Sequence, residues 1–197
     1  MNIDLDHLRA SLLSEPAAGD FVQEDGGEGL PLTPAAVLFP IVLHDAGHTV
    51  LLTQRTAHLR DHAGQIAFPG GRVEAGDASP LHTALRETEE EIGLSRRLID
   101  ILGYLPEYRT GTGFRVTPVV ALVRPPFKLV LDPYEVAEAF EVPLAFLLDQ
   151  ANHQRHSLHY RGALRHFFAM PYGDYFIWGA TAGMIRTLTE RLAQRVT

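Results

Sequence analysis

Four of the five residues from 87 to 91 in this 197-residue chain are glutamates. Glu87, Glu90 and Glu91 stand three and four residues apart, so they would be neighbours on the surface of a helix. Like charges at that spacing cost roughly a few tenths of a kcal/mol per pair, and the helix dipole disfavours anions near the C-terminal end. A hard divalent cation reverses this argument, because Mg²⁺ and Mn²⁺ prefer several oxygen ligands. The stretch therefore indicates either a metal site or a solvated acidic face.

The residues around these glutamates predict the helix that carries them, over residues 78–92. Ser79 can cap its first turn, Pro80 suits the first helical position, and Gly93 is a natural stop. One face collects apolar and small side chains, namely Leu81, Ala84, Leu85, Thr88 and Ile92. The glutamates stand on the other side of this predicted helix.

Two glycines, Gly70 and Gly71, precede this helix by a short loop. They allow the close backbone approach and the unusual dihedral angles that a phosphate-binding loop needs. From Gly71 onwards the chain resembles the Nudix box, G-x5-E-x7-R-E-U-x-E-E-x-G-U, where U is a bulky apolar residue. The matching residues are Gly71, Arg86, Glu87, Glu90, Glu91, Gly93 and Leu94.

The resemblance has three departures. Asp77 stands where the pattern has Glu, Thr88 replaces a bulky apolar residue, and the loop between Gly71 and Arg86 is one residue longer. The resemblance implies that the three box glutamates are catalytic and hold Mg²⁺ or Mn²⁺. It also implies a catalytic-site role for Arg86, which would brace the loop acid, here Asp77.

A second stretch, residues 51–71, resembles the signature that precedes the box in coenzyme A pyrophosphatases, L-L-T-x-R-[SA]-x-x-L-R-x-H-x-G-x-x-x-F-P-G-G. Thr56 takes the Ser or Ala place. The resemblance implies hydrolysis of the pyrophosphate bond of coenzyme A or its derivatives, giving 3′,5′-ADP and 4′-phosphopantetheine or its acyl form. Arginine forks match phosphate oxygens, so a local cationic patch would let an acidic protein hold this substrate. The expected substrate-binding residues are Arg55, Arg60, His62, Gly70 and Gly71.

Two further assignments start from histidines and acids. His58 and His62 stand four residues apart, but no acid follows His58 as in the zinc motif H-E-x-x-H, so we expect His62 to orient the loop or a phosphate.

The general base is Glu91, acting through a metal-bound water, or a later acid. The later acids are Glu135, Glu138 and Glu141, of which Glu135 is assigned the catalytic role. The alternative is that they mark an acidic helix or strand end.

Other functions fit parts of the pattern. ADP-ribose, NADH or another nucleoside diphosphate derivative is the alternative substrate for a Nudix hydrolase. A Nudix-fold sensor that binds a nucleotide without cleaving it often lacks the box glutamates, whereas this chain keeps all three. The formal net charge of −7, from 24 acidic and 17 basic residues, argues against nucleic acid as a partner.

Strands and helices are mixed along the rest of the chain. The expected strands are 35–44, 49–53, 99–109 and 114–123, and the other expected helices are 4–14 and 176–195. This mixture indicates an α/β or α+β class, and the resemblance implies an α/β/α sandwich with a mixed sheet between helices. Residues 1–34 are expected to be an N-terminal helix with a flexible linker, and residues 35–197 the Nudix hydrolase domain.

Composition sets wider limits. Hydrophobic residues make up 46% of the chain, as in a folded domain, and no apolar run approaches the roughly 18 residues that span a bilayer, so we expect no membrane partner. The chain has no cysteine, which excludes disulfides and thiolate zinc sites and fits a cytoplasmic protein. Trp178 is expected in the core or at a contact between two copies, which leaves a homodimer open.

Overall fold

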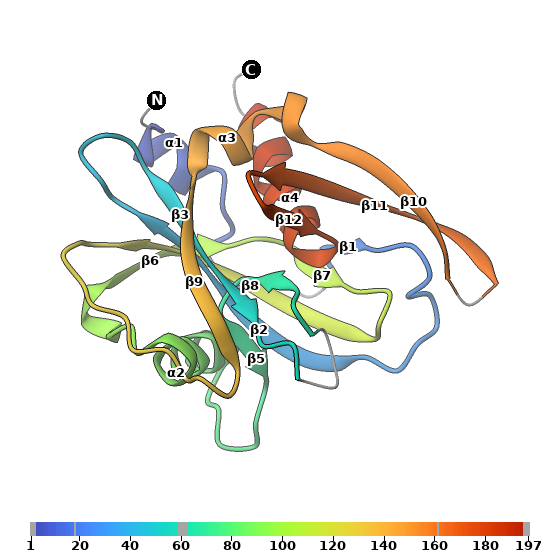
Figure 1. The fold of residues 1–197 in the computed structure, drawn as a ribbon, viewed down its shortest axis with the longest axis horizontal. Coiled ribbons are helices and arrows are strands. Elements are labelled where there is room, and N and C mark those ends of the chain that lie inside the picture. Colours follow the sequence, from blue (N-terminus) through green and yellow to red (C-terminus); the bar gives the residue numbers. More distant parts are fainter. Residues whose placement is uncertain (1–2, 18, 59–62, 161, 195–197) are drawn as a thin grey trace.

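A mixed β-sheet lies between helices on its two faces in this computed structural model (Figure 1). The residues described are 3–17, 19–58, 63–160 and 162–194. One face carries α2 (Pro80–Ile92), and the other carries α1 (Leu5–Ala10), α3 (Leu144–Leu148) and α4 (Ala180–Gln194). Two short 3-10 turns, 96–98 and 150–152, follow α2 and α3. The expected α/β/α sandwich is confirmed.

The central sheet contains nine of the described strands and mixes parallel with antiparallel pairs. They are β1 (Phe21–Gln23), β2 (Thr33–Val42), β3 (Thr49–Arg55), β4 (Ile66–Ala67), β5 (Gly70–Arg72), β6 (Ile99–Tyr104), β7 (Glu107–Arg109), β8 (Phe114–Val123) and β9 (Val136–Pro143). β2 pairs in parallel with β8 along its whole length and antiparallel with β3 and β5. β2 and β3 form an antiparallel hairpin, and β3 pairs on its other side with β9.

The two-residue period of β2 assigns its side chains to the two helical layers. Ala36 and Leu38 belong to the buried cluster that includes Ala84 of α2. Phe39 and Ile41 belong to the larger cluster on the opposite face, which includes four residues of α4: Met184, Ile185, Leu188 and Ala182. Because both faces of β2 are covered, the strand is apolar almost throughout, as is typical of a strand buried on both sides.

Helix α2 has the predicted Ser79 cap and Gly93 stop, and it begins at Pro80, two residues after the predicted start at 78. The Ser79 hydroxyl accepts a hydrogen bond from the His82 backbone N–H at 3.2 Å, and Pro80 occupies the first turn. Gly93 ends the helix with φ of 66°, in the left-handed region that favours glycine. The helix boundaries therefore follow from local residue chemistry.

A second, three-stranded antiparallel sheet consists of β10 (Gln154–Tyr160), β11 (Ala163–Tyr172) and β12 (Tyr175–Trp178), and its β10–β11 hairpin extends away from the body (Figure 1). The predicted helix over 176–195 is therefore wrong at its start. Residues 175–178 form a strand paired with β11, and Gly179, with φ of 62°, separates it from α4. Ile177 is buried as the helical periodicity suggested, but it reaches the core from a strand.

The segment before residue 35 packs on the sheet. Leu8 of α1 is fully buried in the main core, and Leu12 lies beside it. β1 falls within the stretch predicted to be a flexible linker and pairs in parallel with β7. The local composition, rich in Gly, Pro and acids, did not predict this strand because a strand-to-strand pairing so distant in sequence stabilises it.

The predicted strand over 99–109 is divided into β6 and β7. Pro106 lies in the interruption, where a residue without a backbone N–H cannot donate to a sheet. The strand predicted over 114–123 matches β8. None of the described helices combines the length and the apolar character needed to cross a bilayer.

Candidate active site

Glu91 lies at the junction of α2, β5 and β3. Its side chain is 4% exposed, and its carboxylate accepts a hydrogen bond from the Gly70 backbone N–H at 3.1 Å. The Arg55 guanidinium, at the end of β3, lies 3.5 Å from its other oxygen. Two segments predicted to bind substrate therefore meet at one of the predicted metal ligands.

Burial changes the protonation behaviour of two glutamates on this helix. Removal from water raises the pKa of Glu91 to about 8, although the Gly70 N–H and the Arg55 charge act in the opposite direction. Burial also raises the pKa of Glu87, against the lowering effect of the neighbouring Arg86. Both carboxylates therefore lie in places where a negative charge is only partly compensated by the protein.

The two glycines of the loop are required by close packing. A side-chain carbon on Gly71 would lie 2.4 Å from the Glu87 carboxylate carbon. One on Gly70, whose φ is 154°, would lie 2.4 Å from the Ala36 carbonyl oxygen. The two glycines therefore let β5 lie close to both β2 and the glutamate face of α2. This close approach allows the Gly70 N–H to donate its hydrogen bond to Glu91.

Arg86 connects the loop to the helix. Its Nε and one terminal nitrogen donate to the two Asp77 oxygens at 3.0 and 2.9 Å, a two-pronged pairing. Its other terminal nitrogen lies 3.0 Å from Glu87 and 2.9 Å from Glu90. The predicted pairing of Arg86 with Asp77 is confirmed, and the shorter acid reaches the arginine despite the longer loop.

The Asp77 carboxylate has several hydrogen-bond partners besides Arg86. It also accepts from the Glu74 backbone N–H at 2.9 Å and from the Thr83 hydroxyl at 2.8 Å, and the His82 ring nitrogen lies 2.9 Å away. The Arg86 pairing, followed by the Glu74 hydrogen bond, holds the pKa of Asp77 well below its ordinary range. Sequence reasoning missed His82 and Thr83, whose signal is their place in the first turn after the loop acid.

Glu135 is the later acid that joins the cluster. Its carboxylate lies 3.9 Å from Arg55 and is 42% exposed. Glu138 instead accepts a hydrogen bond from the Tyr175 hydroxyl, at 2.8 Å. Glu141 binds His44 and Thr49 at the other end of β3. Among the three later acids, Glu135 is the one that lies beside Arg55, which also contacts Glu91.

The donor chemistry of this cluster fits a hard divalent cation. Glu87 and Glu91 offer carboxylate oxygens one helical turn apart, and their raised pKa values mark negative charge that the protein compensates incompletely. Glu90, 60% exposed, stands on the solvent side of the same turn. Within the described residues no three acidic or histidine side chains converge closely enough to form a complete ligand set, and Arg86 holds two of the glutamates.

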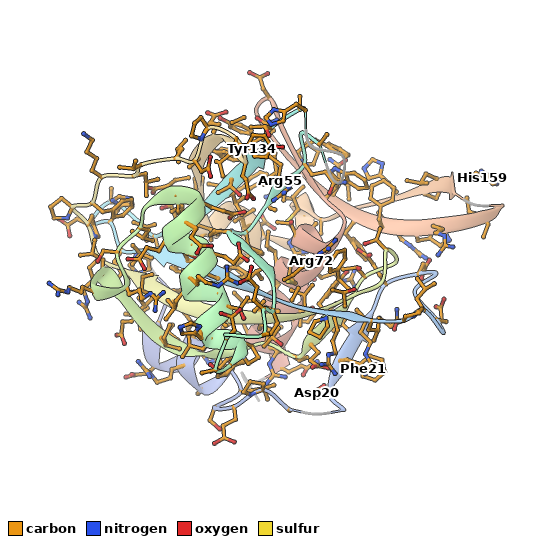
Figure 2. The ribbon with its side chains drawn as sticks, turned by 90° about the horizontal axis from the view of Figure 1, so that it is seen from below. Asp20, Phe21, Arg55, Arg72, Tyr134 and His159 are labelled. Atoms are coloured by element: carbon orange, nitrogen blue, oxygen red, sulfur yellow. The ribbon has the colours of Figure 1, made fainter. Side chains whose placement is uncertain are left out.

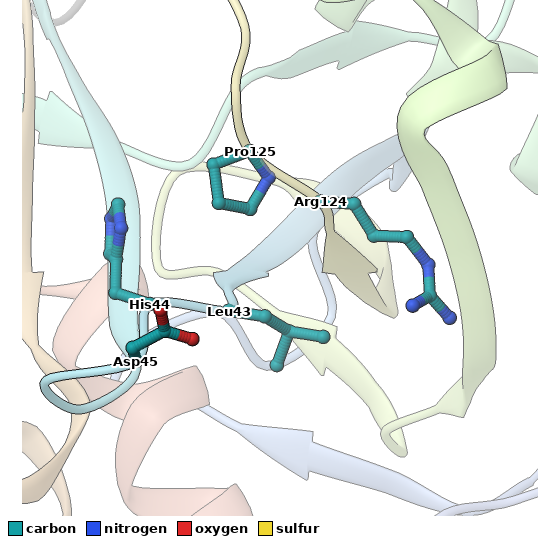
Figure 3. Close-up of a pocket in the computed structure, with 5 residues that line it drawn as sticks. All are labelled: Leu43, His44, Asp45, Arg124 and Pro125. Carbon is teal, nitrogen blue, oxygen red and sulfur yellow. The ribbon is translucent and has the colours of Figure 1, made fainter.

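Two predicted substrate-binding residues, Arg60 and His62, lie outside the described residues. A cavity of about 390 Å³ opens elsewhere, beside the turn between β2 and β3 (Figure 3). Its lining residues are Leu43, His44, Asp45, Arg124 and Pro125. None of the predicted site residues that the structure describes lines this cavity. The assignment of the site therefore depends on the side chains that converge around Glu91.

Comparison with known proteins supports the assignment of the box. The NUDIX domain model matches residues 33–167. The chain is 42% identical over 169 residues to a protein of Citrobacter koseri named uncharacterized Nudix hydrolase NudL, covering 86% of this chain and 88% of that protein. It is 44% identical over 158 residues to the protein of the same name in Escherichia coli K12, covering 80% and 82%.

Solved structures share the fold at lower sequence identity. RenU, a Nudix hydrolase from M. smegmatis, superposes with a TM-score of 0.56 at 20% identity, covering 85% of this chain and 96% of that one. A MutT protein from Methanosarcina mazei gives a TM-score of 0.54 at 22% identity, covering 86% and 98%. With the box geometry, the family model and the close relatives in agreement, the chain belongs to the Nudix family and is a pyrophosphohydrolase of nucleoside diphosphate derivatives.

Proposed function

We propose that this enzyme hydrolyses the pyrophosphate bond of coenzyme A or its derivatives, giving 3′,5′-ADP and 4′-phosphopantetheine or its acylated form. The observation that carries the proposal is the contact of Arg55 with Glu91. Arg55 belongs to the stretch 51–71 that resembles the coenzyme A pyrophosphatase signature, and Glu91 belongs to the Nudix box. The residues that would select the substrate therefore adjoin the residues that would cleave it.

The described parts of this stretch surround the glutamates. β3 ends at Arg55, β4 pairs back on β3 through Ile66 and Ala67, and β5 delivers the Gly70 N–H to Glu91. Arg55 brings positive charge, and Gly70 brings a backbone donor, to a chain whose overall charge is −7. The Arg55 guanidinium has further N–H donors that suit the phosphate oxygens of a pyrophosphate, whereas the single Gly70 N–H is already donated to Glu91.

A divalent ion bound at the glutamates would supply Lewis acidity and neutralise charge that develops on the phosphates. The residues of the chain have separate tasks in this proposal. Glu91, with Glu87 and Glu90, would hold the ion. Arg86 would fix the position of the Asp77 loop relative to the glutamates of α2. Arg55 would orient a phosphate.

Glu135 is the general base that the geometry favours. Its exposed carboxylate, beside Arg55, can accept a proton from an attacking water on the open side of the cluster. Glu138 and Glu141 are occupied by Tyr175, His44 and Thr49. Changing Glu135 to Gln should therefore lower kcat far more than the same change at Glu138.

The decisive experiment compares substrates on the purified enzyme. Turnover of coenzyme A, ADP-ribose and NADH would be measured with Mg²⁺ and with Mn²⁺, and the coenzyme A products identified by mass. We expect the highest kcat/KM for coenzyme A and equal amounts of 3′,5′-ADP and 4′-phosphopantetheine. Faster turnover of ADP-ribose or NADH would overturn the substrate assignment, and tight binding without any cleavage would indicate a sensor.

A variant of Arg55 tests the observation that carries the proposal. Arg55→Ala should lower kcat/KM for coenzyme A by roughly tenfold or more, in line with the loss of a charged hydrogen bond to phosphate. Arg124→Ala is the matched control, since Arg124 is an exposed arginine that pairs with Asp100 away from the glutamates. Equal effects of the two variants would remove the basis for assigning Arg55 to the substrate.

A further inference from the structure

An exposed aromatic side chain stands next to the proposed catalytic acid. Tyr134 is 65% exposed, more than any other Phe, Tyr or Trp side chain that the structure describes. It precedes Glu135, whose carboxylate lies 3.9 Å from Arg55. Figure 2 shows Tyr134 and Arg55 close together, far from the exposed Phe21. The enzyme therefore presents a large ring to solvent beside the group expected to orient a phosphate.

The backbone that carries Tyr134 is held on both sides. Towards α2, the Asp132 N–H donates to the Glu91 carbonyl at 2.9 Å, and the Asp132 carboxylate accepts from the Tyr134 N–H at 2.8 Å. Towards β3, the Thr56 hydroxyl donates to the Tyr134 carbonyl at 2.7 Å, and the Thr56 N–H donates to the Glu135 carbonyl at 2.9 Å. The ring is therefore presented from an anchored position between the two halves of the site.

A second ring lies against it. The His58 imidazole, also exposed, has its centre 4.8 Å from the centre of the Tyr134 ring, at an interplanar angle of 58°. His58 lies in the stretch that resembles the coenzyme A pyrophosphatase signature, and Tyr134 lies about 75 residues later in the chain. Two aromatic side chains from distant segments thus meet at the edge of the glutamate cluster.

We propose that Tyr134, backed by His58, is a stacking surface for the nucleobase of the substrate. This deepens the proposed function and rests on it for the identity of the base, which in coenzyme A is adenine. A purine has a flat π-face that stacks on aromatic rings, whereas pantetheine is a flexible chain of amides and methylenes. Phosphate oxygens held at Arg55 would leave the attached nucleoside within reach of this neighbouring ring.

A pair of ligands that differ only in the base tests the proposal. AMP and ribose 5-phosphate share the sugar and the phosphate, and neither contains the anhydride that the enzyme cleaves. Their dissociation constants would be measured by titration calorimetry on the wild-type enzyme and on Tyr134→Ala, Tyr134→Phe and Phe21→Ala. Phe21 is the matched control because it is an exposed aromatic residue, 41% accessible, that stacks on Arg109 at a distance from Arg55.

Wild-type enzyme should bind AMP more tightly than ribose 5-phosphate. Tyr134→Ala should weaken AMP binding by roughly tenfold, the usual scale of base stacking, and change ribose 5-phosphate binding by less than about twofold. Tyr134→Phe and Phe21→Ala should retain AMP binding. The proposal is overturned if Tyr134→Ala leaves AMP binding intact, if it weakens both ligands equally, or if the wild type does not distinguish them.

This result is separable from the substrate assignment. AMP binding reports on the stacking surface whether or not coenzyme A is cleaved, and the turnover comparison reports on the substrate whether or not Tyr134 contributes. If coenzyme A is the substrate and Tyr134 stacks on its base, Tyr134→Ala should raise KM for coenzyme A while kcat stays within about twofold. A fall in kcat at unchanged KM would instead show that the residue positions Glu135 and does not bind the base.

Discussion

Burial distinguishes the three glutamates that share one turn of α2. The exposed fraction of the side chain is 4% for Glu91, 16% for Glu87 and 60% for Glu90. A buried carboxylate is costly unless donors or a cation compensate it. Glu91 receives the Gly70 N–H and the Arg55 charge, yet its pKa stays raised, at about 8. The most buried glutamate is therefore the one that gains most from a bound cation.

Replacing Glu91 by Gln tests its role at the residue scale. Gln keeps the shape and an oxygen that can accept from Gly70, but it removes the negative charge that would hold a metal ion. We expect kcat to fall by roughly 10²–10⁴-fold, the range associated with a catalytic group, with an unchanged circular dichroism spectrum. Turnover of coenzyme A at saturating Mg²⁺ is the measurement.

The control for this variant lies on the same helix. Glu89 is half exposed and pairs with Arg96 at 3.0 Å, away from the Gly70 loop. Glu89→Gln should keep turnover within about twofold, since exposed ion pairs contribute little to stability. Substantial activity in Glu91→Gln, or an equal loss in both variants, would contradict the assignment of Glu91 to the metal.

At the scale of elements, the site depends on how the 73–79 loop is held against α2. Asp77 accepts from the loop backbone at Glu74 and from Thr83 and Arg86 on the helix. Its depressed pKa means that the ionised form favours the folded chain. The associated stability is present above the pKa of aspartate in the unfolded chain, roughly 4, and is lost as the pH falls below it.

Asp77→Asn should therefore lower the melting temperature at pH 7 and reduce the loss of stability on acidification. Thermal melts of the variant and the wild type at pH 7, 5, 4 and 3 would show curves that approach each other at low pH. Asp45→Asn, at the exposed turn after β2, is the control and should follow the wild type. A constant gap between Asp77→Asn and the wild type at every pH would refute this account.

Helix α1 is a second element whose role is structural. Leu8 is fully buried in the main core, and Arg191 of α4 donates to the Ser11 carbonyl at 2.7 Å. Leu8→Ala should reduce the free energy of unfolding by about 2–5 kcal/mol, the usual cost of removing a buried leucine side chain. Urea titration would measure it.

The neighbouring residue provides the comparison. Arg9→Ala, at an exposed position of the same helix, should change the free energy of unfolding by less than about 0.5 kcal/mol. If Leu8→Ala proved as mild as Arg9→Ala, the N-terminal helix would contribute little to the stability of the folded enzyme.

At the scale of the whole molecule, a chain with a formal charge of −7 must hold an anionic substrate. The fold provides positive charge at the site itself, because β3 places Arg55 beside the glutamate face of α2. A bound cation would add further positive charge there. The same ion should stabilise the folded chain, because a ligand that binds only the folded state shifts the unfolding equilibrium.

Mg²⁺ should raise the melting temperature of the wild-type enzyme. At a hundred times its dissociation constant, the ion would add about 2.7 kcal/mol to the free energy of unfolding, and Glu91→Gln should show a much smaller increase. Melts with NaCl at equal ionic strength control for general screening of the acidic surface. The same increase with NaCl, or in Glu91→Gln, would contradict a specific site at the box.

The sequence by itself determined the parts of this protein that depend on neighbouring residues. The ends of α2 follow from Ser79, Pro80 and Gly93, and β8 follows from its apolar run, because capping and periodicity are local properties. The pairing of Arg86 with the loop acid Asp77 followed from the box resemblance, and the two residues are nine positions apart along the chain.

Only the tertiary structure decided what depends on pairing between distant segments. Residues 176–178 were predicted to begin a helix but belong to β12, which pairs with β11, and β1 exists because β7 lies beside it. Sequence reasoning assigned the catalytic role to Glu135 without any contact that separates it from Glu138 and Glu141. The partners that distinguish the three, Arg55, Tyr175 and His44, come from the tertiary structure. Tyr134 meets His58 for the same reason. Contacts between distant segments stabilise these arrangements. The local sequence pattern does not identify which distant residues will make those contacts.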